Sequence, residues 1–231
     1  MLATETPAPL RRAAPTLVGS WVGIAVVVVG VGWLLTHPLE HSVGDPENDL
    51  ARWFEDRRTS TLTTTAHVFT TPGDTIVVLA LASLLVLGLL GLRQWRSALF
   101  VALAVGGVYG IYVLGFTLAH RDRPPVKILD PGLVPNHSFP SGHVAAATVL
   151  WGVVVVLARA YLPGVARWLV PVLVVIPPLV LVSRLYLGAH HLSDTRVGML
   201  FGLAWLVVLT LTLRPGPEAE RAMSLGAERE G

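Results

Sequence analysis

The chain contains no cysteine and few charged residues. Only 14% of its 231 residues are charged, whereas a typical soluble domain carries about 25%. The absence of cysteine excludes disulfide bridges, thiolate-bound metals and a cysteine nucleophile. Of the 17 basic residues only Lys127 is a lysine, and the formal net charge is +2, so there is no basic tract suited to nucleic acid. These deficits argue against a water-soluble globule and against a nucleic-acid-binding protein.

Long apolar stretches are abundant. Hydrophobic residues make up 53% of the chain and the mean hydropathy is +0.64. A helix needs about 20 apolar residues to cross a bilayer, and six stretches are long enough: 16–36, 75–92, 97–119, 141–159, 168–188 and 197–213. The sequence therefore predicts an all-α, polytopic membrane bundle of six transmembrane helices. The first stretch exceeds a signal-peptide core and lacks a cleavage site, so we expect it in the mature chain.

The segments around the spans have their own patterns. Pro171, Pro177 and Pro178 should bend the fifth span, because proline removes a backbone donor. In the loop 37–74, the run Asp45-Pro46-Glu47 predicts a helix start. Leu50, Trp53 and Phe54 would form the apolar face of this helix, which we expect to lie at the membrane surface without a catalytic role. Residues 1–15 and 214–231 are expected to be disordered cytoplasmic segments.

Basic residues indicate the orientation. Six spans place both termini on one side, and that side carries nine arginines: 11, 12, 93, 96, 159, 167, 214, 221 and 229. The other side carries eight basic residues, of which we set aside Arg121, Arg123 and Arg184 as functional. The positive-inside rule then predicts cytoplasmic termini in a plasma (inner) membrane protein. All eight histidines fall on the extracytoplasmic side.

Three polar clusters interrupt the apolar pattern, and polar groups at membrane spans indicate function by default. The first, residues 120–125, follows the third span. The second, residues 138–143, opens the fourth span, and the third, residues 183–194, joins the fifth to the sixth. The span count places all three clusters on the extracytoplasmic face, so we expect them to form one site.

The residue types in these clusters suit a phosphate group. The guanidinium groups of Arg123 and Arg184 can bind a tetrahedral oxyanion with paired donors. Pro140 and Ser141 read as a helix start, where free backbone N–H groups favour an anion and the Ser141 hydroxyl adds a donor.

Two histidines supply the chemistry of phosphoryl transfer. His190 and Asp194 are four residues apart, so on a helical turn Asp194 could accept the Nδ1 proton of His190 and direct Nε2 outward. A neutral imidazole in this state can attack phosphorus and form a phosphohistidine. His143 could then protonate the leaving oxygen as a general acid. This scheme needs no metal and no cofactor.

With these residues identified, the chain resembles the type 2 phosphatidic acid phosphatase superfamily of integral-membrane lipid phosphatases, which are related to vanadium haloperoxidases. The family motifs are K-x6-R-P, P-S-G-H and S-R-x5-H-x3-D. The second is present whole as residues 140–143, and the third as Ser183, Arg184, His190 and Asp194. The resemblance implies His190 as nucleophile, Asp194 as its partner and His143 as acid. It implies four phosphate-binding residues: Arg123, Arg184, Ser141 and Gly142.

The first motif is incomplete. Arg123 and Pro124 are present, but Phe116 occupies the lysine position. Loss of one charge-assisted contact would weaken the enzyme by about 1.5–3 kcal/mol without abolishing activity. His120, one turn after Phe116, or Arg121 is expected to replace the cation and contribute to substrate binding.

Alternatives to a histidine phosphatase remain. A metal hydrolase would use His143, His190, His191 and Asp194 as ligands, although the nearby arginines would repel a cation. A transporter or scaffold could use the same polar cluster only to bind an anion. For the phosphatase, a site open to lipid favours a lipid phosphate over a haloperoxidase-like substrate. Phosphatidic acid, phosphatidylglycerophosphate and a polyprenyl diphosphate all fit, with a slight preference for the polyprenyl carrier.

Overall fold

The computed structural model describes residues 10–217, and within them the chain is α-helical apart from loops and one 3-10 turn. The helices are α1 (Leu10–Thr36), α2 (Glu40–Glu55), α3 (Ser60–Thr70), α4 (Thr75–Gly91), α5 (Trp95–Leu118), α6 (Gly142–Tyr161), α7 (Pro163–Leu173), α8 (Ile176–Tyr186) and α9 (Leu192–Leu213). The 3-10 turn η1 (Thr71–Gly73) lies between α3 and α4.

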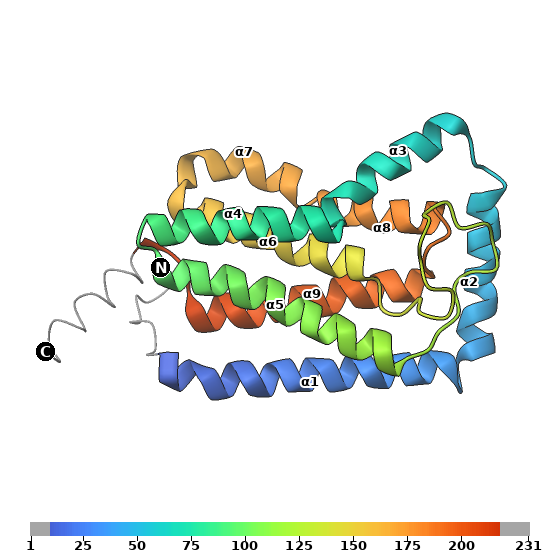
Figure 1. The fold of residues 1–231 in the computed structure, drawn as a ribbon, viewed down its shortest axis with the longest axis horizontal. Helices are drawn as coiled ribbons and strands as arrows, with labels where there is room; N and C mark the ends of the chain where they lie inside the picture. The colour runs from blue at the N-terminus through green and yellow to red at the C-terminus, as the bar shows by residue number, and fades with distance from the viewer. Residues whose placement is uncertain (1–9, 218–231) are drawn as a thin grey trace, which may run out of the picture.

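Six helical segments in the described part are long and apolar enough to cross a membrane, which confirms the predicted all-α membrane bundle. The protein is an integral membrane protein. α1 begins and α9 ends at the same end of the bundle, and α2 lies across the opposite end (Figure 1). We call this opposite end the α2 end.

Most spans begin or end a few residues from the predicted positions. α1 begins at Leu10, so residues 10–15 are helical instead of disordered. Residues 10–14 are leucine, arginine and alanine, which are good helix formers, and Pro15 is accommodated inside the helix. α9 begins at Leu192, five residues before the predicted start. Of the predicted C-terminal segment, residues 214–217 are described, and Arg214 caps α9; residues 1–9 and 218–231 lie outside the described residues.

The loop after α1 is more helical than predicted. α2 begins at Glu40, with Pro46 inside it, although the Asp45-Pro46 pair predicted the start. Val43 packs against the core, which favours helix in the residues before Pro46. The face that contacts the bundle also differs from the prediction. Trp53 is 47% exposed with Arg57 stacked over its ring, whereas Glu47 is turned inward.

The second span is longer than its apolar run, because α3, η1 and α4 together form one membrane-spanning segment, residues 60–91. α3 is rich in threonine, so its sequence is not apolar enough to be recognised as part of a membrane span. Thr64 and Thr65 bond to the carbonyls of Ser60 and Thr61, four residues earlier, so their polar groups are satisfied within the helix. Asp74 then caps α4 by accepting the N–H of Ile76.

The fifth span is broken, as its prolines predicted. It consists of α7 and α8, with Val174 and Val175 between them. The break gives α8 its own direction at the α2 end of the bundle (Figure 1).

α6 is the most buried of the spans and carries the P-S-G-H motif at its start. α9 approaches it closely through glycine. A Cβ on Gly198 would lie 2.7 Å from the carbonyl oxygen of Ser141, so only glycine fits there without a shift of one helix. This close approach brings the start of α9 against the start of α6.

Candidate active site

The three polar clusters of the sequence meet at the α2 end. The segment after α5, the start of α6 and the segment between α8 and α9 all lie there (Figure 1). Backbone hydrogen bonds join them. The N–H of Ser138 donates to the carbonyl of Arg121 at 2.8 Å, and the N–H of Ser141 donates to the carbonyl of Asp194 at 3.1 Å. Residues far apart in the chain therefore form one polar site.

Asp194 is fully buried at the centre of this site. Its Oδ1 accepts from Nη1 of Arg121 at 2.5 Å. Its Oδ2 accepts from the hydroxyl of Ser138 at 2.5 Å and from the N–H of His191 at 2.8 Å. Since Asp194 lies in the first turn of α9, its charge is also favoured by the helix dipole. The carboxylate holds the three segments together.

His190 does not bond to Asp194 in the way the sequence predicted. Its Nδ1 lies 3.9 Å from Oδ2 of Asp194, too far for a hydrogen bond, and 2.6 Å from the carbonyl oxygen of Ser138. A carbonyl only accepts, so Nδ1 carries the proton and Nε2 has the free lone pair. The predicted tautomer is therefore present, but Ser138 fixes it.

The charge state of His190 also suits a nucleophile. Burial lowers the pKa of this imidazole well below its usual value, and the positive charges of Arg184 and Arg123 lower it further. His190 is therefore neutral at physiological pH, with Nε2 available to react.

Arg184 is completely buried, and only part of its guanidinium is paired. Its Nη1 donates to Oδ2 of Asp130 at 2.7 Å and to the hydroxyl of Thr70 at 3.1 Å. Its Nε and Nη2 are buried without a partner among the described residues, and so is the hydroxyl of Ser141. Buried donors are nearly always satisfied in proteins, so these unpaired donors indicate a place for a ligand with several acceptors.

Arg123 is oriented differently from the predicted phosphate clamp. Its Nε donates to the carbonyl of Val134 at 2.8 Å and its Nη2 to the carbonyl of His137 at 2.9 Å, while Nη1 donates to the carbonyl of Ala189. Burial and the neighbouring Arg184 lower its pKa. Arg123 holds the segment before His190 against the segment before α6, which leaves fewer of its donors for a ligand.

Arg121, predicted as a substitute cation, donates to two carboxylates and to the hydroxyl of Ser193. Besides Asp194 it bonds to Oε2 of Glu47 at 2.9 Å through Nη2. Burial opposes the charge of Arg121, but the two carboxylates outweigh this effect and raise its pKa. Arg121 is thus a structural cation of the site, because its charge is already neutralised.

His143 and Gly142 lie in the first turn of α6, directly after the extended N-cap residue Ser141. A Cβ on Gly142 would lie 2.9 Å from the ring of Tyr112, so the aromatic ring closes over this glycine. His143 is half-buried, and η1 packs against its backbone at Gly73. Among residues 10–217, no group of three or more His, Asp or Glu side chains is placed to hold a metal ion.

Several residues of the site had no role in the sequence prediction. Asp130 and Thr70 orient Arg184, Ser138 bonds to both Asp194 and His190, and Glu47 bonds to Arg121. Ser138 directly precedes Phe139 and the P-S-G-H motif, so proximity in sequence could have suggested it. Glu47 lies more than 70 residues from Arg121, and no spacing connects them.

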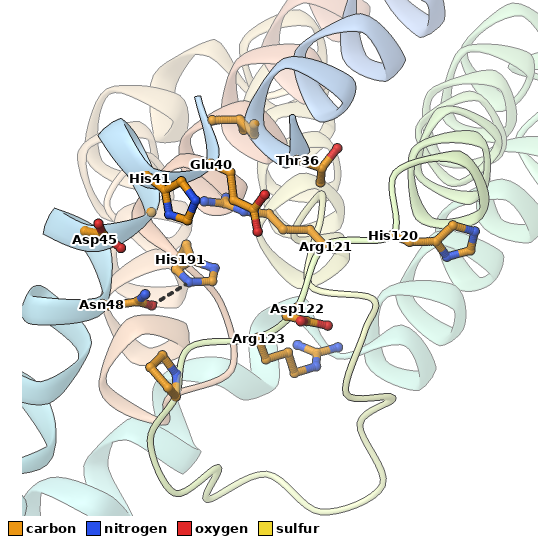
Figure 2. A pocket seen from close by; sticks show the side chains of 13 residues that line it. Thr36, Glu40, His41, Asp45, Asn48, His120, Arg121, Asp122, Arg123 and His191 are labelled. Carbon is orange, nitrogen blue, oxygen red and sulfur yellow. Dashed lines mark hydrogen bonds between the residues drawn. The ribbon is translucent and has the colours of Figure 1, made fainter. Parts of the chain in front are cut away.

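A cavity of about 400 Å³ lies beside the site, between the end of α1, the first half of α2 and residues 120–125 (Figure 2). His191 lines it and shares a hydrogen bond of 3.1 Å with Asn48 of α2, drawn as a dashed line. The lining also includes the carboxylate residues Glu40, Asp45 and Asp122 and the basic residues Arg121 and Arg123. The cavity is thus polar and rich in hydrogen-bond acceptors.

Comparison with known proteins agrees with this arrangement. The family model described as the PAP2 superfamily matches residues 94–215, more than half of the chain and all three motif segments. The chain belongs to the PAP2 superfamily.

Two curated relatives have the same printed name, decaprenylphosphoryl-5-phosphoribose phosphatase, and come from Mycobacterium tuberculosis strains CDC 1551 / Oshkosh and ATCC 25618 / H37Rv. Each is 35% identical over 124 residues, which cover 51% of this chain and 64% of the relative. The alignment thus spans somewhat less than two thirds of the length of these relatives.

The fold is also shared with a solved PAP2 structure. The crystal structure of the first transmembrane PAP2 type phosphatidylglycerolphosphate phosphatase from Bacillus subtilis superimposes with a TM-score of 0.70. The match covers 80% of this chain and 94% of that chain at 22% sequence identity. It confirms the transmembrane PAP2 fold.

At the lysine position of the first PAP2 motif, Phe116 takes part in a cluster of aromatic rings. The ring of Phe116 lies 4.4 Å from the ring of His137, which is also 5.0 Å from the ring of His120. Of the two predicted substitutes, Arg121 is paired with carboxylates, and His120 is exposed beside His137. His120 remains a prediction for substrate binding.

Proposed function

We propose that this PAP2 protein is a metal-independent lipid phosphatase that acts through a phosphohistidine at His190. The observation that carries the proposal is the set of unpaired buried donors, Nε and Nη2 of Arg184 and the hydroxyl of Ser141. A phosphate monoester has enough acceptors to satisfy all of them, and a charged guanidinium binds it more tightly than a neutral donor would.

The proposed reaction has two steps. In the first, Nε2 of His190 attacks the terminal phosphorus, and its bond to the leaving oxygen breaks; this oxygen is the lipid alkoxide oxygen in a monophosphate and the bridging oxygen in a diphosphate. His143 gives that oxygen a proton. In the second, His143 takes a proton from water, the hydroxide attacks the phosphohistidine, and inorganic phosphate leaves as His190 is regenerated. The bond from Nδ1–H to the Ser138 carbonyl leaves the lone pair of His190 on Nε2 for the attack.

The proposed substrate is a polyprenyl-linked phosphate or diphosphate. The mycobacterial relatives are named for a decaprenyl-linked phosphoribose, which supports a polyprenyl lipid. The polar cavity supports a substrate with hydroxyl groups near the phosphate, because Glu40, Asp45 and Asp122 line it with acceptors. Phosphatidic acid and phosphatidylglycerophosphate are the competing substrates.

Phosphate release from this panel of lipids by purified wild-type protein tests the proposal, with His190→Ala as the inactive variant. Acid-labile phosphate trapped on His190 is expected during turnover. An anion-binding transporter or scaffold, the alternative function, would bind the same lipids and release no phosphate.

We also propose that the α2 end faces the extracytoplasmic side of the plasma membrane, as the arginine distribution indicates. Because the chain has no cysteine, a single Asp49→Cys substitution provides a unique label. A membrane-impermeant maleimide should react with it in intact cells. Labelling only after lysis would place the site on the cytoplasmic side.

A further inference from the structure

The amphipathic helix α2 is part of the hydrogen-bonded structure of the site, beyond its place at the membrane surface. It crosses the α2 end of the bundle and contacts the segments that carry the motifs (Figure 1). Glu47 contacts Arg121 and Ser193, Asn48 contacts His191, and Phe54 packs edge-on against Tyr186. One face of α2 therefore reaches the first and the third motif segments.

Glu47 makes the strongest of these contacts. Its side chain is only 10% exposed, and the Arg121 side chain that it meets is 7% exposed. Its Oε2 accepts from Nη2 of Arg121 and from the hydroxyl of Ser193, both at 2.9 Å. Its Oε1 accepts from the backbone N–H of Ser193 at 2.6 Å. A buried carboxylate with three bonds to charged and backbone donors is firmly placed.

The bond to Ser193 gives Glu47 a second effect. Ser193 is the second residue of α9, whose first backbone N–H groups have no partner within the helix. Glu47 supplies an acceptor for one of them and a negative charge at the positive end of the helix. It thereby fixes the first turn of α9, where Asp194 lies.

A continuous series of contacts leads from Glu47 to the nucleophile. Glu47 bonds to Arg121, Arg121 to Asp194, and Asp194 accepts the hydroxyl of Ser138. The carbonyl of Ser138 in turn accepts Nδ1–H of His190. The carboxylates of Glu47 and Asp194 hold Arg121 between them, so removal of either leaves its guanidinium partly unpaired.

We infer that Glu47 is a positioning residue of the active site, which acts through Arg121 and Asp194 on His190; the inference rests on the proposed phosphatase function. Glu47 does not touch the phosphate. It keeps the Arg121–Asp194 pair and the start of α9 in the arrangement that orients the nucleophile. A misplacement of about 1 Å at a reacting group lowers turnover by about 10²-fold.

The experiment compares kcat and KM for the best lipid phosphate in Glu47→Ala, Glu47→Gln and Asp49→Asn. Asp49 is the matched control, because it lies on α2 in an exposed ion pair with Arg52 and contacts no motif residue. Glu47→Ala should lower kcat by about 10- to 100-fold and leave KM within about threefold. Glu47→Gln, whose oxygen can still accept from Arg121, should recover part of kcat, and Asp49→Asn should match wild type.

A double-mutant cycle separates positioning from general stability. If Glu47 acts largely through Arg121, Glu47→Ala should cost clearly less kcat in the Arg121→Ala background than in wild type, the remaining loss being that of the bonds from Ser193 to Glu47. Losses that multiply would overturn the inference, and so would wild-type kcat in Glu47→Ala. Thermal melting in detergent identifies a variant that does not fold. If Glu47→Ala does not fold, the same double-mutant cycle with Glu47→Gln and Arg121→Ala decides whether Glu47 is a positioning residue.

Failure of the proposed function would appear differently, as wild-type protein that releases no phosphate from any lipid. In that case binding of orthovanadate, a phosphate analogue, is measured by titration calorimetry. Glu47→Ala should weaken it by at least about tenfold relative to wild type and Asp49→Asn, because the analogue depends on the same oriented imidazole. Equal affinity in all three proteins would refute the positioning role.

Discussion

Replacement of Arg184 by lysine tests the phosphate site most directly. The substitution keeps the positive charge and can keep the ion pair with Asp130, which is 2.7 Å from Nη1. It removes the fork geometry, because a lysine ammonium is a point charge at the end of a flexible stem. What disappears is the pair of buried donors, Nε and Nη2, that have no partner within residues 10–217.

The expected loss follows from those two donors. A hydrogen bond to a charged group contributes about 1.5–3 kcal/mol, so two of them amount to about 3–6 kcal/mol. At about 1.4 kcal/mol for each tenfold change, kcat/KM of Arg184→Lys should fall by roughly 10²- to 10⁴-fold. The free protein should lose little stability, because the missing donors bond to nothing in the described part of the chain.

Phosphate release from a lipid phosphate in detergent micelles measures this effect, with Arg159→Lys as control. Arg159 is exposed in the last turn of α6, far from the start of that helix. Orthovanadate should raise the melting temperature of wild type and of the control, but raise that of Arg184→Lys much less. A kcat/KM for Arg184→Lys within about threefold of wild type would show that the free donors of Arg184 do not bind phosphate.

Further predictions concern other parts of the site. Ser138→Ala should lower kcat less than Asp194→Asn, because it removes one of the bonds to the carboxylate and keeps the Ser138 carbonyl that bonds to His190; steady-state kinetics of both variants measures this. Gly198→Ala should lower the melting temperature, since its Cβ would lie 2.7 Å from the Ser141 carbonyl, whereas Gly88→Ala, with open space around it, should not. Because the pKa of His190 is depressed, its protonation should lower kcat/KM only below pH 6.5 in a pH profile. Below pH 6.5 the unfolded chain binds this proton and the folded protein does not, so the free energy of unfolding should fall by up to about 1.4 kcal/mol per pH unit. Phosphate release should persist in excess EDTA, because the site presents guanidinium groups to the substrate; loss of activity restored by a divalent cation would contradict this.

The spans could be predicted because each must be apolar over the thickness of the bilayer. The same criterion missed α3, which is rich in threonine and therefore not apolar; the hydroxyls of Thr64 and Thr65 bond to carbonyls of the same helix, so these residues are compatible with it. The Asp45-Pro46 pattern misplaced the start of α2, because one proline inside a helix removes a single backbone bond, and Val43 packs against the core to offset that loss.

Local motifs predicted which residues gather at the site but not how they bond. The four-residue spacing suggested that His190 and Asp194 share a helical face. α9 begins at Leu192, however, so His190 precedes the helix and bonds to the Ser138 carbonyl instead. From residue type alone, the clustered arginines were all predicted to bind an anion. The structure distinguishes the three arginines by the groups to which they bond. Arg123 bonds to carbonyls, Arg121 to carboxylates, and only Arg184 keeps buried donors unpaired.

This division among the arginines explains how a chain with so few charges can build a phosphate site. Each buried guanidinium must be compensated, since an unpaired charge in a low-dielectric interior is unfavourable by several kcal/mol. Arg121 is compensated by Glu47 and Asp194, which makes it a rigid support. Arg184 has one ion-pair partner among residues 10–217, Asp130, whose side chain is 26% exposed, so its charge is compensated less fully than that of Arg121 and a bound anion would complete the compensation. The carboxylates therefore decide which cation is structural and which remains available for the substrate, and this is why Glu47, outside every motif, belongs to the site.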